Sequence, residues 1–422
     1  MLSEQKVSRR RLITGSTGLV AGALSSNLLW APAASGRAQL AGHNAYFSQL
    51  NRLLKREGPG HPVMLLDAAR MNHNLDQITR SVGPNKHYRA VVKSLPSVPL
   101  LKHVTERAKT NALMVFHQPF LNAIADNFSD ADVLIGKPMP IQAARTFYRK
   151  QNNKKFSTAN QVQWLVDSEE RLLQYQALAR ELGVSLGINF EIDVGLHRGG
   201  FVEPEALAES LRIIEADPMH LQLKGLMGYE PQLTGLKADL NHPSVRKVLE
   251  VYRGFIDRLK QQGHEVEKLT LNGAGSHTLK IYERDKTMND LSAGSGVVMP
   301  TDFDTHHLNG NQAALFIATP ILKRYPKNPV IPNPPELMEQ IYYIYGGYWK
   351  AKMVSPPQIG EPIYESTNQS PIATSSKVNL EVDDYMFLRP TQSEFVMLQF
   401  GDLRVIEDGQ LSKRWPVFHQ TG

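Results

Sequence analysis

The chain has 422 residues, 41% of them hydrophobic and 21% charged, which is the composition of a folded globular protein rather than a disordered one. The net charge of +6 is modest and residues 1–33 supply half of it, so the composition argues against nucleic-acid binding. The sequence contains no cysteine, which excludes disulfides, thiolate metal sites and cysteine nucleophiles. The length predicts more than one folded domain.

The first 33 residues have the three parts of an export signal. Residues 8–14 read SRRRLIT, an uncharged and mildly apolar stretch follows to residue 30, and Ala31-Pro32-Ala33 is an A-x-A cleavage pattern. This order is typical of a twin-arginine signal peptide. We therefore expect a periplasmic or otherwise exported protein that meets the twin-arginine translocase. The alternatives are an uncleaved membrane anchor and a chance cluster of arginines.

The next segments alternate between strand and helix patterns. Residues 44–57 predict a short amphipathic helix and residues 63–67 a strand. Eight further apolar runs predict strands, at residues 90–93, 112–116, 133–136, 164–167, 186–193, 223–229, 269–273 and 291–296. Helical spacing fills many of the intervals, for example at residues 69–82, 169–182, 204–216 and 244–262. About eight βα units predict a closed, TIM-like (β/α)8 barrel, with a doubly wound open sheet as the alternative.

The C-terminal part has a different pattern. Residues 323–335 are rich in proline and predict a loop, and the segments beyond them are strand-like and rich in turns, which predicts a mostly β domain. We divide the chain into the signal peptide at 1–33, a helix and strand at 34–67 that join the β domain, the barrel at 68–310, and the β domain at 311–422.

Three candidate site residues follow predicted barrel strands, where the chemistry of such barrels gathers. Lys93 ends the first strand, and a partly buried lysine there suits Schiff-base chemistry, although a surface lysine capping the strand is the alternative. Residues 191–200, EIDVGLHRGG, place Arg198 at the rim, where it could equally form a structural salt bridge. Tyr229 lies at the end of the sixth strand and could line a pocket, move a proton, or simply pack as an aromatic.

Two loops rich in glycine and serine predict an anion-binding cup. They are NGAGSHT at 272–278, with Gly275 and Ser276, and SAGSG at 292–296, with Gly294 and Ser295. Backbone N–H groups and hydroxyls in such loops converge on phosphate, and barrels commonly hold phosphate after the seventh and eighth strands. A lysine facing a phosphate cup suggests pyridoxal phosphate bound as an imine.

His306 and His307 could suggest a metal site. No second ligand cluster lies at metal spacing, so we interpret them as loop or strand histidines.

The order of these segments resembles one family. VMLLD, RAVVKSLPS, EIDVGLHRGG, GLMGYEPQ, NGAGSHT and FLRPTQSEFVMLQFGD are similar to segments of the D-threonine aldolase and D-serine dehydratase-like group, over residues 61–415. These are pyridoxal-phosphate enzymes with an alanine-racemase-type barrel and an added β domain. The resemblance implies an amino acid substrate, a homodimer, and a β domain that closes the active site.

The resemblance also implies roles for the candidate residues. Lys93 would be the Schiff-base lysine and a base at the substrate α-carbon. The phosphate would be held by Ser276, with Gly275 and the Gly294–Ser295 backbone. Arg198 and Tyr229 would face the cofactor or the substrate.

One departure from the family concerns a metal. Metal-dependent members carry a histidine and a second ligand two residues later, where this chain has Gln392 and Glu394. The neutral carbonyl of glutamine is a weak ligand for zinc or manganese, so a catalytic metal is doubtful.

The favoured function is therefore an exported pyridoxal-phosphate lyase of the aldolase or dehydratase type that acts on D-amino acids through Lys93. One alternative is a metal-independent racemase or deaminase of the same fold. The other is a non-catalytic protein that binds pyridoxal phosphate or a D-amino acid.

Overall fold

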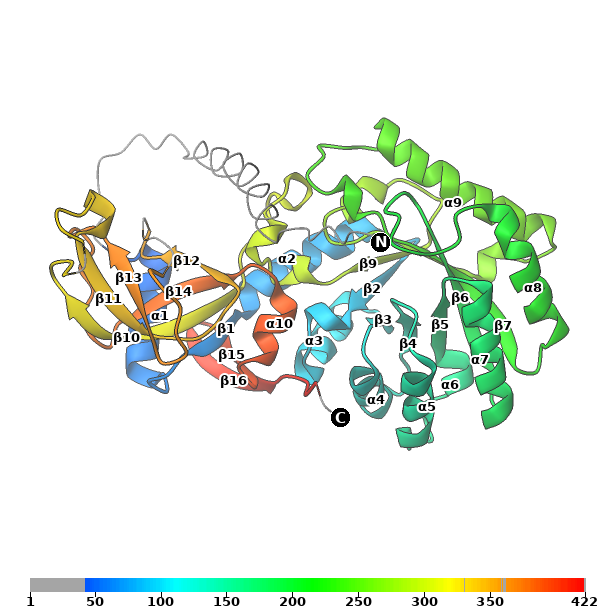
Figure 1. Ribbon diagram of the computed structural model, residues 1–422, viewed down its shortest axis with the longest axis horizontal. Coiled ribbons are helices and arrows are strands. Elements are labelled where there is room, and N and C mark those ends of the chain that lie inside the picture. Colours follow the sequence, from blue (N-terminus) through cyan, green and yellow to red (C-terminus); the bar gives the residue numbers. More distant parts are fainter. Residues whose placement is uncertain (1–41, 330, 358, 360–361, 421–422) are drawn as a thin grey trace, which may run out of the picture. The chain divides into compact units, whose positions relative to one another are not determined.

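The computed structural model describes residues 42–329, 331–357, 359 and 362–420 (Figure 1). The expected signal peptide at 1–33 lies outside the described residues. No helix in the described part of the chain is long and apolar enough to cross a membrane.

Eight parallel strands form a closed barrel in chain order (Figure 1). They are β2 (His87–Val91), β3 (Ala112–Val115), β4 (Asp132–Ile135), β5 (Val162–Val166), β6 (Leu186–Ile192), β7 (Leu221–Gly228), β8 (Thr270–Gly273) and β9 (Asp290–Ala293). Strand β9 pairs with β2 and closes the ring, with Ala90 opposite Ala293. Each predicted run overlaps one of these strands, so the predicted (β/α)8 barrel is confirmed and the open-sheet alternative is wrong.

One helix precedes the first barrel strand, and the others lie in the intervals between barrel strands. They are α2 (Ala68–Val82), α3 (Val98–Ala108), α4 (Gln118–Asn127), α5 (Ile141–Lys150), α6 (Thr158–Gln161), α7 (Glu169–Leu182), α8 (Leu207–Ala216) and α9 (Pro243–Gln261). Capping residues set several boundaries. Ser168 accepts a hydrogen bond from the Arg171 N–H at the start of α7, and Gly183 ends that helix in the left-handed conformation. The helix expected at 204–216 begins as a 3-10 turn at Pro204–Ala206 before α8.

A second sheet contains eight strands. Its main path runs through β12 (Ala351–Ser355), β14 (Tyr385–Pro390), β10 (Leu315–Tyr325), β1 (Val63–Asp67), β15 (Asp402–Glu407) and β16 (Gln410–Pro416), and β11 (Gln340–Tyr345) and β13 (Gln369–Thr374) join it through β10. The N-terminal strand β1 lies between β10 and β15, so the sheet combines both ends of the described chain. Phe47, Leu50 and Leu54 of α1 (Ala45–Glu57) pack in one apolar cluster with this sheet. The expected mostly β C-terminal region is confirmed.

One short helix connects two strands of the second sheet, in a region where the sequence pattern predicts only strands and turns. Helix α10 (Ser393–Leu398) lies between β14 and β15 in the chain. Its six residues are too few to produce a recognisable helical period. This helix carries Glu394, one of the two residues at the altered metal-ligand positions.

The barrel interior contains a buried ionic network at one level and an apolar layer at another. The Arg89 side chain is fully buried, and its guanidinium makes two hydrogen bonds of 2.8 Å to the Asp290 carboxylate and one of 2.7 Å to Asp132. These contacts tie β2 to β9 and β4. An apolar cluster around Val91, Met114 and Met227 fills the barrel above them and forms the floor of the cavity described below.

Replacement of Arg89 should destabilise the barrel strongly. In Arg89→Met the buried Asp290 carboxylate loses its partner, so we expect the free energy of unfolding to fall by about 3–5 kcal/mol. Arg107→Met is the matched control, because the Arg107–Asp76 pair is exposed and its loss should change stability by about 1 kcal/mol or less. Urea unfolding measures both variants, and equal losses in the two would contradict this account.

Candidate active site

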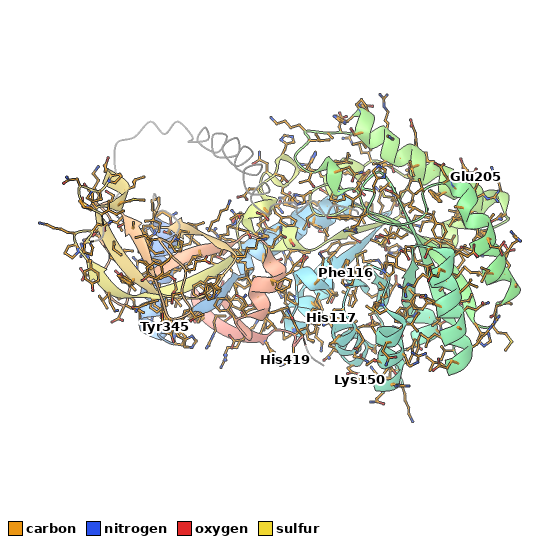
Figure 2. The ribbon with its side chains drawn as sticks, in the orientation of Figure 1. Phe116, His117, Lys150, Glu205, Tyr345 and His419 are labelled. Carbon is orange, nitrogen blue, oxygen red and sulfur yellow. The ribbon has the colours of Figure 1, made fainter. Side chains whose placement is uncertain are left out.

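The seven residues selected from the sequence line one cavity at the carboxyl ends of the barrel strands. These are Lys93, Arg198, Tyr229, Gly275, Ser276, Gly294 and Ser295. The wall also includes residues that the sequence analysis did not select, among them Phe116, which follows β3 (Figure 2), His277 and Glu394. The placement agrees with the rule that side chains at strand ends converge on the mouth of a barrel.

Lys93 lies two residues beyond its strand. Strand β2 ends at Val91, and Lys93 is the middle residue of a 3-10 turn at Val92–Ser94, so the expected strand end at residue 93 is wrong. Its Nζ lies 2.9 Å from Glu394 Oε1 and 5.0 Å from the centre of the Phe116 ring. The Lys93 side chain is 41% exposed and lines the cavity, with a carboxylate and an aromatic ring beside its amine.

Helix α10 brings Glu394 to this lysine from the second sheet. Ser94 Oγ donates a hydrogen bond of 3.2 Å to Glu394 Oε1, and Ser393 Oγ donates one of 3.1 Å to the Ser94 carbonyl. The hydroxyls of Ser393 and Ser295 lie 3.2 Å apart. The first turn of α10 is thus hydrogen-bonded to the 3-10 turn at Val92–Ser94, which we call the lysine turn, and it contacts the loop after β9.

Gln392 takes part in a different contact. Its Nε2 donates a hydrogen bond of 2.7 Å to Asp302 Oδ2. No group of three or more histidine, cysteine, aspartate or glutamate side chains that could hold a metal ion occurs within the described ranges. His306 and His307 lie in a 3-10 turn, His306–Leu308.

The two loops of the expected cup meet at Ser276. Its Oγ accepts hydrogen bonds from the backbone N–H groups of Gly294, at 3.2 Å, and Gly296, at 3.0 Å. An oxygen at this position is therefore bound by two converging backbone donors, which is the arrangement that loops use to hold phosphate oxygens. The donor set fits an anion.

Gly294 has a steric reason to be glycine. A Cβ atom at this position would lie 2.7 Å from Ser94 Cβ and 2.8 Å from Val91 Cβ. Both neighbours belong to the segment that carries Lys93, so the absent side chain lets the cup approach the lysine turn closely.

Arg198 and Tyr229 form a cation–π pair across the cavity. The guanidinium carbon lies 5.2 Å from the centre of the tyrosine ring. The loop that carries Arg198 is fixed by Asp193, which accepts hydrogen bonds of 2.9 Å from the N–H groups of Gly195 and His197. Burial, with the nearby charge of Glu230, raises the pKa of Tyr229, so its phenol stays protonated at neutral pH.

His277 lines the cavity although the sequence analysis assigned it no role. Its ring stacks on Phe303 with ring centres 4.2 Å apart, and burial lowers its pKa, which favours the neutral imidazole at neutral pH. Its place inside the NGAGSHT loop was the only available signal, and histidines in loops are too common for that signal to carry weight.

The fold and the cavity define a class: an α/β-barrel protein with a lysine amine and a cup of glycine and serine residues at the barrel mouth. The alanine racemase N-terminal domain family matches residues 66–301, and the chain belongs to this family. A 3-hydroxy-D-aspartate aldolase of Paracoccus denitrificans (strain Pd 1222) is 28% identical over 172 residues, which is 37% of this chain and 42% of the relative. The similarity to that protein thus covers less than half of its length.

Solved structures share the fold over most of the chain. A D-threonine aldolase from Filomicrobium marinum superposes with a TM-score of 0.67 and 15% identity, covering 84% of this chain and 94% of that one. A D-threo-3-hydroxyaspartate dehydratase from Delftia sp. HT23 gives 0.68 and 14%, covering 85% and 97%. An alanine racemase from Bacillus anthracis gives 0.64 and 14%, covering 84% and 97%. At this identity the likeness establishes the fold alone.

Introducing a methyl group at Gly294 should disturb the cup. We expect Gly294→Ala to lower the free energy of unfolding by roughly 1–3 kcal/mol, because the new Cβ overlaps Ser94 and Val91. Gly42→Ala is the control, since no atom lies within 4 Å of a Cβ there. Denaturant unfolding compares the two, and an unchanged stability in Gly294→Ala would show that the lysine turn can yield.

Proposed function

We propose that the protein is a pyridoxal 5′-phosphate enzyme that acts on D-amino acids as a lyase of the aldolase or dehydratase type. The observation that carries the proposal is that the Lys93 amine lines one cavity with the cup residues Gly275, Ser276, Gly294 and Ser295. Pyridoxal phosphate has an aldehyde and a phosphate, which match an amine and an anion cup. Membership of the alanine racemase N-terminal domain family supports the same cofactor.

The residues present fit this cofactor. Lys93 would bond the aldehyde carbon, and the Ser276 hydroxyl, with Gly275 and the Gly294–Ser295 backbone, would hold the phosphate. When bound, pyridoxal phosphate supplies an electron sink for cleavage of a bond at the substrate α-carbon.

Around that position, the chain supplies groups that hold and move protons. The Tyr229 hydroxyl is protonated at neutral pH and can donate, while the Lys93 amine, once released, can accept. The Arg198 guanidinium carbon lies 5.2 Å from the centre of the tyrosine ring, within the range of a cation–π contact. Glu394 lines both this cavity and the adjoining outer one, where a substrate side chain would lie, together with His277, Phe303 and Lys350.

The substrate class rests on the relatives. Those named above are an aldolase of 3-hydroxy-D-aspartate, a D-threonine aldolase and a D-threo-3-hydroxyaspartate dehydratase, and all of these names describe D-amino acids with a β-hydroxyl. We propose the same class for this chain. Because Gln392 is bonded to Asp302 and Glu394 to Lys93, we propose that the reaction does not depend on a metal at these positions.

A metal-independent racemase is the second candidate. Lys93 and Tyr229 both line the cavity, and two acid–base groups are what removal and return of an α-proton require. Alanine racemases are among the structural relatives. Racemisation would change the optical rotation of the substrate but leave its mass unchanged.

Export and assembly form a separate part of the proposal. Export by the twin-arginine route rests on residues 1–33, and replacement of Arg9 and Arg10 by lysine should retain the protein inside the cell. A homodimer rests on the family resemblance, and light scattering of the purified chain would measure its mass.

Product analysis tests the lyase proposal. The cofactor-loaded protein is incubated with D-threonine and D-serine, with and without a chelator, beside Lys93→Ala. We expect glycine plus aldehyde, or pyruvate plus ammonia, to form regardless of the chelator and to fall by several orders of magnitude in the variant.

Each of the other possible results of the product analysis would contradict one part of the proposed function. Chelator sensitivity would contradict the metal-independent mechanism. Intact substrate that changes its chirality would favour the racemase. Bound cofactor without any turnover would favour a binding protein.

A further inference from the structure

A buried carboxyl group lies behind the anion cup and has no part in the proposed reaction. Glu230 follows Tyr229 after β7, and it is 1% exposed. Thr278 Oγ1 donates a hydrogen bond of 2.6 Å to Glu230 Oε1. Thr278 Oγ1 in turn accepts a hydrogen bond of 3.0 Å from the Gly275 N–H. Two consecutive hydrogen bonds thus connect the carboxyl group to the backbone of the cup loop.

Three phenols are the titratable neighbours of Glu230. Tyr229 adjoins it in the chain, Tyr252 interacts with it from α9, and Tyr282 does so from the 3-10 turn Leu279–Tyr282. Burial raises the pKa of each phenol, so all three stay neutral near pH 7. The nearest histidine in the cup loop, His277, has a lowered pKa and is also neutral there.

Glu230 itself can change charge in the physiological range. Burial raises its pKa to about 7, and the hydrogen bonds from Thr278 and from the Ala274 backbone limit the rise. Its carboxyl group is therefore the group in this surrounding that gains or loses a proton near neutral pH.

We propose that Glu230 is a positioning residue whose proton is linked to anion binding in the cup. The neutral carboxyl group accepts the Thr278 hydrogen bond, which holds Gly275 and its loop in place without adding a charge. The ionised form puts a negative charge behind the loop that must receive a phosphate, and the two repel each other. The inference rests on the proposed function in one respect, that the cup binds the cofactor phosphate.

The sign of the effect follows from linkage. A bound anion disfavours the ionised carboxylate, so binding raises the Glu230 pKa further and takes up a proton from solution. Affinity should therefore be highest below the Glu230 pKa and should fall as the pH rises through it. The second ionisation of the phosphate also changes with pH, so the Glu230 contribution must be read as a difference between two proteins.

The experiment uses pyridoxamine 5′-phosphate, which has no aldehyde and cannot form an imine with Lys93. Its dissociation constant is measured by fluorescence for the cofactor-free full chain and for Glu230→Gln, from about pH 6 to about pH 8.5. The amide has the same shape and keeps an oxygen for Thr278. We expect the ratio of the two constants to change by on the order of tenfold across this range, with the wild type losing affinity relative to the variant at high pH.

Three further variants separate the linkage from other effects. Glu283→Gln removes one exposed carboxylate on the neighbouring turn and should keep the pH dependence of the wild type. Thr278→Val breaks the connection and should weaken binding at every pH, whereas Thr278→Ser should restore it. If Glu230→Gln does not fold, Glu230→Met takes its place, and calorimetry in two buffers of different ionisation enthalpy compares the proton uptake of the wild type with that of the variant.

The outcomes distinguish this inference from the proposed function. Equal pH dependence, or equal proton uptake, in the wild type and the Glu230 variant would overturn the role of Glu230 and leave the cup intact. Failure of the wild type to bind the probe at any pH would contradict the cup itself and this inference with it.

Discussion

The pairing of β9 with β2 is the constraint on which the site depends. It closes the barrel, and the parallel register that places Ala90 opposite Ala293 also brings the loop after β9 beside the turn after β2. Arg89 fixes this seam from inside, because its guanidinium binds Asp290 on β9 and Asp132 on β4. The lysine turn and the anion cup are therefore neighbours because the first and last barrel strands are neighbours.

The second sheet completes the site through a single short helix. Helix α10 contributes Glu394 to Lys93 and Ser393 to the backbone of the lysine turn and the hydroxyl of Ser295. Residues 392 and 394 stand at positions where metal-dependent members of the resembling family carry metal ligands. The structure shows a carboxylate ion-paired with the lysine instead. This contact gives the site a carboxylate from outside the barrel strands and their loops.

Much of the fold could be predicted from the sequence because its strands are buried on both faces. The barrel strands appear as short continuous apolar runs, and glycine or a capping side chain marks the ends of several helices, as Ser168 and Gly183 do for α7. The strand-end rule then placed Lys93, Arg198 and Tyr229 at one rim. The rule works because parallel strands share the same carboxyl edge.

The contacts that tune the site could not be predicted. Lys93 and Glu394 are paired across some 300 positions of sequence, and no local pattern records such a pair. Helix α10 is too short to have a period, and the 3-10 turn at Lys93 looked like the end of a strand. In the sequence, Glu230 is only the residue after Tyr229. Its burial behind the cup depends on the contact between the residues after β7 and the loop after β8, which no local pattern indicates.

The central claim is that Lys93 bonds pyridoxal phosphate in this cavity. The most direct measurement is to load the protein with the cofactor, reduce it with borohydride, digest it, and locate the pyridoxyl group by mass spectrometry. The account predicts that the group lies on Lys93 and that Lys93→Ala retains no covalent label. A label on another lysine, or no label on a protein shown to bind the cofactor, would contradict it.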